Sequence, residues 1–343
     1  MKKNFSILIL LTTLLGVLVA SGSKEAVNNQ RDFRAQEVVV YTYDSFLTDW
    51  GAGPEITRLF EEKTNYTVTF ISSGDGAQIM SRAILESDAP QADVLLGIDN
   101  NQIDVARENN IMVPYKPTGT EALYSFVILD EEWLMTPYDW SYFTIIYDTL
   151  SNLAVPTCLE DLTKPLYEKK IILLDPRTST PGLGFAAWTV AVFGDKYLDY
   201  WTLLKNNILT MAPSWDTGYG LFTSGEAPLV ISYITSPAYH VECENSQRYQ
   251  ALLFPQGHIM QIEGAGLVRN ALNPEGGKAF IDFLITEEAQ NALPLTQWMY
   301  PVNKNVSLPP SYAAAPQANK QLFVDNTSLS NAVGQIMNVL TTK

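Results

Sequence analysis

The chain has 343 residues, a formal net charge of −15, two cysteines and two histidines. This length exceeds one ordinary hydrophobic core and fits two lobes of ~150 residues each. The acidic charge argues against nucleic acid as a partner, because a phosphate polyanion needs a basic stripe and no Lys/Arg cluster occurs beyond Lys169 and Lys170. The negative charge favours a cationic small ligand, or it serves solubility alone.

Residues 1–23 have the pattern of a secretory signal peptide. Lys2 and Lys3 precede an apolar run from Ile7 to Ala20, which is shorter than the ~20 residues of a membrane helix. Ser21 stands where a bacterial lipoprotein signal has its lipid-accepting cysteine. Two alternatives follow: a protein released by ordinary cleavage, or a lipid anchor in a natural form with cysteine at position 21. We expect a periplasmic or cell-surface protein, with residues 24–36 as a disordered leader.

The first half of the chain predicts strands that alternate with helices. Such alternation is typical of an α/β fold with a parallel sheet covered by helices, which binds ligands at the carboxyl ends of its strands. Residues 43–45, 73–76 and 97–100 would therefore lie along one rim. The expected elements are strand 38–43, helix 54–64, strand 67–72, helix 77–87, strand 92–98 and helix 101–109.

A second series begins near residue 143, and the strand 257–262 is expected to return to the first lobe. We assign residues 37–137 and 264–343 to lobe 1 and residues 138–263 to lobe 2, with a ligand cleft that closes between them. The second series consists of strand 143–147, helix 159–166, strand 171–174, helices 183–193 and 196–206, and strand 229–233, followed by helices 274–286 and 287–293.

Two glycine turns precede helices. In DPRTSTPGLGF, residues 175–185, Ser179 and Thr180 can cap the helix, and the two glycines can let backbone amides approach an anion. A capped helix without a ligand is an equally good interpretation. SSGDGAQ, residues 72–78, repeats the theme with Asp75 and Gly76, although a single Gly-Asp-Gly more often marks a tight turn.

Aromatic residues recur beside turns. Trp215 in PSWDTGYGLF and Trp298 in LTQWMYP are examples, and Trp50 follows the first strand. Many of the other rings must belong to the core. Rings at strand ends near carboxylates favour a flat cation, through stacking and cation–π attraction.

No catalytic or metal site and no cofactor is predicted. His240 and His258 lack a metal-ligand spacing, and no Gly-x-Ser-x-Gly motif occurs. Cys158 and Cys243 have no motif spacing and are expected to be unpaired. Carboxylates at the rim could form a glycosidase pair, but we prefer a binding role for them; they are Asp44, Asp49, Asp75 and Asp99.

The chain resembles the bacterial thiamine-binding periplasmic proteins of ATP-driven importers. The resemblance runs from about Val38 to Leu308 and departs at the Cys-less signal and after Pro310. Blocks that combine aromatic residues with turns carry it, among them VYTYDSFLTDWGAGPEI, ADVLLGIDNN, PYDWSYFTIIYD, LLDPRTSTPGLGF, SWDTGYGLFTSGE, LVISYITSPAYH and WMYPVN.

This resemblance implies a monomeric two-lobed periplasmic-binding-protein fold of the second class with thiamine, or its phosphate esters, between the lobes. Its partner would be the membrane permease of an ABC importer with its ATPase. The ring box would be Tyr43, Trp50, Trp215, Tyr239 and Trp298, and the polar ends of the ligand would meet Asp75, Gly76, Ser179 and Tyr233.

Two other interpretations stay open. One is a ferric-ion receptor of the same fold, although its typical adjacent tyrosines are missing here. The other is a thiaminase-like enzyme, which would need a nucleophilic cysteine in the cleft, and neither Cys158 nor Cys243 has the setting of an activated thiol.

Overall fold

The computed structural model describes residues 35–129, 131–324 and 326–342. The predicted signal peptide lies outside the described residues, and so does nearly all of the predicted leader, of which Ala35 and Gln36 are described. None of the helices in these ranges combines the length and apolar character that a membrane crossing requires.

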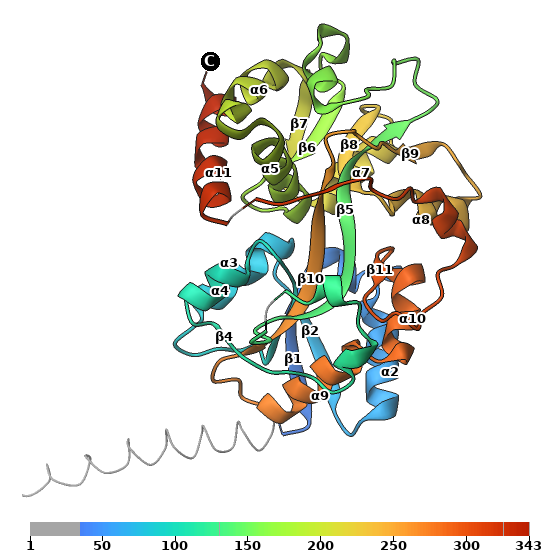
Figure 1. Ribbon diagram of the computed structural model, residues 1–343. Helices are drawn as coiled ribbons and strands as arrows, with labels where there is room; N and C mark the ends of the chain where they lie inside the picture. The colour runs from blue at the N-terminus through green and yellow to red at the C-terminus, as the bar shows by residue number, and fades with distance from the viewer. Residues whose placement is uncertain (1–34, 130, 325, 343) are drawn as a thin grey trace, which may run out of the picture.

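Two long strands join the two lobes. β5 (Thr136–Asp148) and β10 (His258–Val268) pair antiparallel and run from one lobe into the other (Figure 1). The sheet order is β2-β1-β3-β10-β5-β8-β6-β7, so the two strands lie at the centre of one continuous path. The two-lobed α/β fold is confirmed, and the predicted lobe boundaries at residues 137/138 and 263/264 fall inside these shared strands.

Lobe 1 is built on a parallel trio of strands. β1 pairs parallel with β2 on one side and with β3 on the other, and β10 adds antiparallel to β3. Helices cover the sheet and share one core with it. The elements are β1 (Glu37–Thr42), η1 (Asp44–Leu47), α2 (Gly53–Lys63), β2 (Thr67–Ser72), α3 (Gly76–Leu85), β3 (Val94–Asp99), α4 (Ile103–Glu108), β4 (Met112–Val113), η2 (Thr120–Ala122), η3 (Ser125–Val127), α9 (Pro274–Leu284), α10 (Glu287–Thr296) and β11 (Tyr300–Pro301).

Lobe 2 has its own core around β6, which pairs parallel with β7 and β8. The predicted strands 171–174 and 229–233 are confirmed with the same bounds, whereas the helix predicted at 159–166 is two short 3-10 turns. The elements are η4 (Leu159–Thr163), η5 (Pro165–Tyr167), β6 (Ile171–Leu174), α5 (Thr180–Phe193), η6 (Gly194–Lys196), α6 (Tyr197–Leu204), η7 (Lys205–Asn207), β7 (Ile208–Ala212), α7 (Trp215–Thr223), β8 (Leu229–Tyr233), α8 (Ser236–Glu244) and β9 (Tyr249–Ala251).

The end of the chain returns to lobe 2, so its assignment to lobe 1 is wrong. After η8 (Pro310–Ala314) and β12 (Gln321–Leu322), the helix α11 (Asn326–Thr341) packs beside α5 and α6 (Figure 1). Its buried residues Leu329, Ala332 and Ile336 join the lobe 2 core. An apolar stripe on a helix can pack on the core of either lobe. The path of the chain before α11 brings this helix to lobe 2.

Candidate functional site

A cavity of about 290 Å³ lies between the lobes. It takes its walls from the strand ends and helix starts of both lobes, as expected for open α/β sheets. Every predicted binding residue except Ser179 lines it. The lining residues are Tyr43, Ser45, Trp50, Asp75, Gly76, Thr180, Trp215, Asp216, Tyr219, Gly220, Thr223, Tyr233, Ser236, Tyr239, His240, Glu244, Glu263, Gln297, Trp298 and Met299.

Aromatic rings from the two lobes meet at this cavity. Trp50 of lobe 1 lies 6.4 Å from Trp215 of lobe 2, measured between ring centroids, and Trp215 stacks on Tyr219 at 5.0 Å. At another part of the wall, Tyr239 of α8 meets Trp298 edge to face at 5.3 Å. The expectation that these rings converge from distant segments is therefore met by the fold, while their contact with a ligand stays a prediction.

Local backbone geometry positions Trp215 and Trp298 on the cavity wall. Trp215 is not in a loop, as its turn-rich surroundings suggested, but is the first residue of α7, whose N-cap Ser214 accepts a hydrogen bond from the Thr217 amide. The Trp215 indole N–H donates to Ser232 at 2.8 Å. Trp298 follows the end of α10 with φ of 59°, a left-handed conformation that favours glycine. Trp133 has the same conformation in the core, so at Trp298 it is the place on the cavity wall that points to a functional role.

Asp75 links the two lobes through its carboxylate. It caps α3 of its own lobe, accepting from the Gly76 amide at 2.6 Å, and it accepts from the Trp215 amide of lobe 2 at 2.9 Å. Burial raises the pKa of Asp75, and the hydrogen bonds from the Trp215 and Gly76 amides oppose that rise. The two glycine turns of the sequence thus face each other across the cleft.

Ser179 and the glycines that follow it differ from the prediction. Ser179 is the N-cap residue of α5 but makes no side-chain cap, and it is fully buried, so its neighbour Thr180 lines the cavity instead. A Cβ on Gly182 would lie 2.4 Å from the Leu174 carbonyl oxygen, and one on Gly184 would lie 2.2 Å from the Phe143 ring. These glycines let α5 pack on the sheet; they do not open its amides to a ligand.

A carboxylate that the sequence did not single out lies on the cavity wall. Glu263 of β10 accepts hydrogen bonds from the hydroxyls of Tyr138, at 2.6 Å, and Tyr43, at 3.0 Å, and from the Gln261 amide. Burial raises the pKa of Glu263 despite these donors. Its position inside a strand gave no signal, because in the sequence it is one acidic residue among apolar neighbours.

Other missed wall residues include a buried histidine and its two hydrogen-bond partners. The His240 ring contacts the Tyr219 hydroxyl through Nε2 and the Glu244 carboxylate through Nδ1, at 2.9 Å and 2.8 Å. Burial lowers the pKa of His240, which favours the neutral ring at neutral pH. Tyr233 of β8, which was predicted, lines the cavity nearby; burial, followed by the charges of Glu263 and Asp75, raises its pKa well above the usual value.

The charge of the wall is one-sided. Its ionisable carboxyls are Asp75, Asp216, Glu244 and Glu263, and no lysine or arginine is found among the described lining residues. Aromatic faces together with carboxylates can hold a flat cation, by stacking and by charge. Within the described ranges, no group of three or more His, Cys, Asp or Glu side chains is placed to hold a metal ion.

The chain matches a family model described as bacterial extracellular solute-binding protein, over residues 55–320. It belongs to that family. The two-lobed fold and the interlobe cavity of this solute-binding protein agree with the membership.

Curated relatives agree with the resemblance inferred from the aromatic blocks. The thiamine-binding periplasmic protein of Brucella melitensis is 37% identical over 84% of this chain and 86% of its own length. That of Escherichia coli is also 37% identical, over 82% of this chain and 85% of its own length. Among solved structures, a periplasmic thiamin binding protein superposes with a TM-score of 0.83 at 32% identity, covering 89% of this chain and 96% of the other. The predicted resemblance is confirmed.

Proposed function

We propose that this solute-binding protein captures thiamine in the interlobe cavity and delivers it to the permease of an ABC importer. The observation that carries the proposal is the cavity itself, where rings from both lobes and unneutralised carboxyls meet, in a chain whose relatives bear the name thiamine-binding periplasmic protein. Thiamine combines a positively charged thiazolium with an aminopyrimidine, and both rings are flat. Stacking supports each ring, and the acidic wall supports the charge.

We assign no chemistry to the protein. Burial raises the pKa of both cysteine thiols, Cys158 and Cys243, which are free in the structure, whereas an activated thiol has a lowered pKa. Incubation with thiamine followed by recovery of intact ligand tests this directly. A coloured tyrosinate complex on addition of ferric ion would support the iron receptor instead.

The phosphate esters of thiamine form the second ligand class of the proposal. Their phosphate would lie beside Asp75 on the cavity wall, where the starts of α3 and α7 meet. An ionised Asp75 repels a phosphate, whereas a protonated one donates a hydrogen bond to it. The pKa of Asp75 is raised, so we expect ester affinity relative to that of thiamine to fall as pH increases. Competition between thiamine and its monophosphate at several pH values measures this ratio.

The first experiment is to denature the purified protein and identify any released small molecule by mass spectrometry, followed by titration calorimetry of the stripped protein with thiamine. Loss of one stacking ring in a desolvated site weakens binding by about 1–2 kcal/mol, or roughly five- to thirtyfold. We expect that loss for Trp215→Ala and Trp298→Ala.

Phe126→Ala is the matched control, because this half-exposed ring contacts Trp140 in lobe 1 and does not line the cavity. Unfolding of the ligand-free variants is measured in parallel. Unchanged affinity with a large fall in stability would assign both tryptophans to the core and contradict the ring box.

A further inference from the structure

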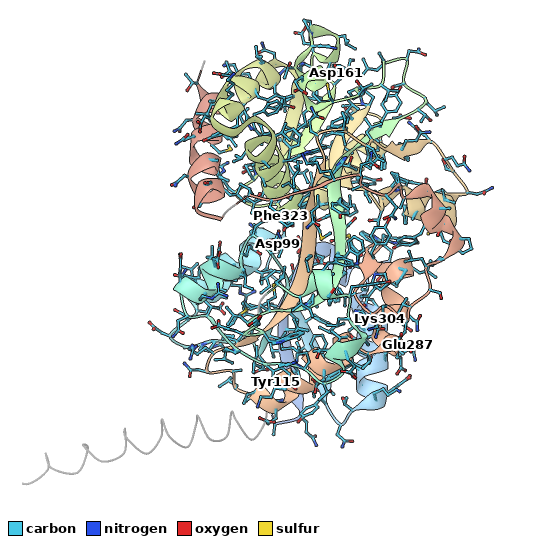
Figure 2. All side chains as sticks on the ribbon, in the orientation of Figure 1. Asp99, Tyr115, Asp161, Glu287, Lys304 and Phe323 are labelled. Carbon is cyan, nitrogen blue, oxygen red and sulfur yellow. The ribbon has the colours of Figure 1, made fainter. Side chains whose placement is uncertain are left out.

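Three buried carboxyl side chains lie in one row across the strands that join the lobes. In the sheet register, Glu263 of β10 is opposite Asp99 of β3 on one side and opposite Asp139 of β5 on the other. Exposed fractions are 0% for Asp99 and Asp139 and 5% for Glu263. Figure 2 shows Asp99 at the level where the two lobes meet. Like charges directly opposite on neighbouring strands destabilise a sheet, so this row needs a physical reason.

Hydrogen bonding distinguishes the two members nearest the centre. Glu263 accepts from two tyrosine hydroxyls and one amide, which favours its ionised form. Neither carboxyl oxygen of Asp139 has a hydrogen-bond partner among the described residues. An ionised carboxylate without donors is costly to bury, so Asp139 is the neutral member of the pair. Glu263 also differs in reaching the cavity, whereas Asp139 does not line it.

Asp99 is satisfied by its own turn. Its carboxylate accepts from the backbone amide and the side-chain amide of Asn101, at 2.9 Å and 3.1 Å. It adds negative potential beside Glu263 without reaching the cavity wall. The row therefore presents one carboxyl to the cavity and keeps the other two behind it, with no cation among the contacts of Glu263 in the described residues.

We propose that Glu263 is the counter-ion of the positively charged ring of the ligand, and that it releases its proton when the cation enters the cavity. The inference rests on the proposed function, since it names the group that selects the cationic form of that ligand. Asp139, neutral behind Glu263, adds no charge of its own, so burial and the negative potential of Asp99 are what oppose ionisation of Glu263 in the free protein. A bound cation would balance the negative charge of Glu263, which explains why three carboxyls lie side by side in the sheet.

The sign of the pH dependence follows from the groups that face Glu263. These are Tyr43 beyond β1, Asp99 of β3, Tyr138 and Asp139 of β5 and Tyr233 of β8. The tyrosines stay neutral because burial and the carboxylates raise their pKa values. The other two facing groups are carboxyls, so none of the described groups that face Glu263 supplies a positive charge. The cation binds to ionised Glu263, so affinity rises with pH until Glu263 is ionised in the free protein.

The test is calorimetry of thiamine binding in buffers of different ionisation enthalpy, from about pH 5.5 to about pH 8.5. Below the raised pKa of Glu263, binding should release up to about one proton per ligand, and affinity should rise by up to about tenfold per pH unit. Proton release and the rise in affinity should both vanish at the highest pH values, where Glu263 is already ionised in the free protein. Proton release of zero throughout, with thiamine bound, overturns the inference and leaves the proposed function intact. Absence of thiamine binding at every pH instead rejects the proposed function.

Variants assign the proton. Glu263→Gln should abolish proton release and reduce the preference for thiamine over its neutral isostere, in which a thiophene replaces the thiazolium. Asp139→Asn makes the same chemical change one strand away; because it mimics a group that is already neutral, thiamine should still bind more tightly than the isostere. Equal preference for thiamine over the isostere in the parent protein and in Glu263→Gln contradicts the assignment.

A second variant keeps the test decisive where Glu263→Gln does not fold. Tyr138→Phe removes the 2.6 Å donor to Glu263 without touching the cavity wall. Loss of a donor to the charged form should raise the pKa of Glu263 and shift the rise in affinity to higher pH. A curve that does not move, in a folded variant that binds thiamine, removes Glu263 from the titration and leaves Asp75 and His240, other wall groups with a shifted pKa, as its source.

Discussion

The helices α3 and α5 begin alike in sequence and differ in what their starts do. Each follows a strand and has glycine at its first residues, Gly76 in α3 and Gly182 and Gly184 in α5, and each points its first turn toward the cleft. At α3, Asp75 lies on the cavity wall and reaches the Trp215 amide of the other lobe. At α5, Ser179 is buried without a side-chain cap, and Gly182 and Gly184 serve close packing on the sheet. A glycine-rich helix start therefore predicts that another group lies close to the backbone. It does not tell whether that group belongs to a ligand, to the other lobe or to the helix's own sheet.

The difference arises from which surface lies opposite each glycine. Gly76 faces the other lobe, where a Cβ would lie 2.5 Å from Thr180 Oγ1. Gly182 faces its own sheet. We therefore expect substitutions at α3 to change closure and affinity, and substitutions at α5 to change the stability of lobe 2.

Gly182→Ala should have the largest effect. The new Cβ meets backbone atoms of Leu174 and Asp175, which cannot rotate away, so the free energy of unfolding should fall by about 3 kcal/mol. Urea unfolding measures the loss. Gly334→Ala in α11 is the matched control, since its Cβ would meet nothing within 4 Å, and it should be neutral or stabilising. A Gly182→Ala variant that keeps its stability but binds thiamine more weakly would show that this turn contacts the ligand instead of packing on the sheet.

Asp75→Asn should weaken thiamine binding by about 2 kcal/mol, or about thirtyfold. The carboxylate accepts two backbone amides, one from each lobe, and the asparagine amide nitrogen would face one of these donors. Calorimetry with thiamine measures the change.

The control for Asp75→Asn is Asp161→Asn. Asp161 also accepts a backbone amide, that of Thr157 at 2.8 Å, but within lobe 2 and far from the cavity (Figure 2). It should change stability and leave affinity unaltered. Equal affinities for Asp75→Asn and the parent protein would show that the contact between the lobes is dispensable.

Gly76→Ala should weaken binding by about 1 kcal/mol, roughly fivefold, because its Cβ hinders the approach of Thr180 as the lobes close. Small-angle scattering with saturating thiamine should show a less compact molecule than the parent. The double variant with Thr180→Ala removes the clashing hydroxyl and should recover part of the affinity. Failure of that rescue would place the clash inside lobe 1, at the Gly97 carbonyl 3.0 Å away.

Ser179→Ala should have the smallest effect, below about 0.5 kcal/mol in affinity, and it should be equal for thiamine and thiamine monophosphate. The hydroxyl does not line the cavity and has no hydrogen-bond partner among the described residues. Calorimetry with both ligands measures it. A selective loss for the phosphate would restore the phosphate site first predicted at this helix start.

Much of the fold follows from local patterns. Short apolar runs bounded by turns located β1, β2, β6 and β8. Nearly every residue of β1, β6 and β8 is buried, and a strand covered on both faces shows such a continuous apolar run in the sequence. The resemblance to the thiamine-binding periplasmic proteins selected five rings from the aromatic residues beside turns, and all five line the cavity: Tyr43, Trp50, Trp215, Tyr239 and Trp298.

The remaining features depend on contacts between distant segments, which only the tertiary structure decided. The stripe of α11 at Leu329, Ala332 and Ile336 is apolar on either lobe, and the crossing of the chain chose lobe 2. Glu263 and Asp139 are 124 positions apart and become neighbours through strand register, which also leaves Asp139 without a donor. The sequence determined which side chains could bind a flat cation; the register of β5 and β10 decided which carboxyl meets it, because pKa and charge depend on burial and neighbours and not on residue type.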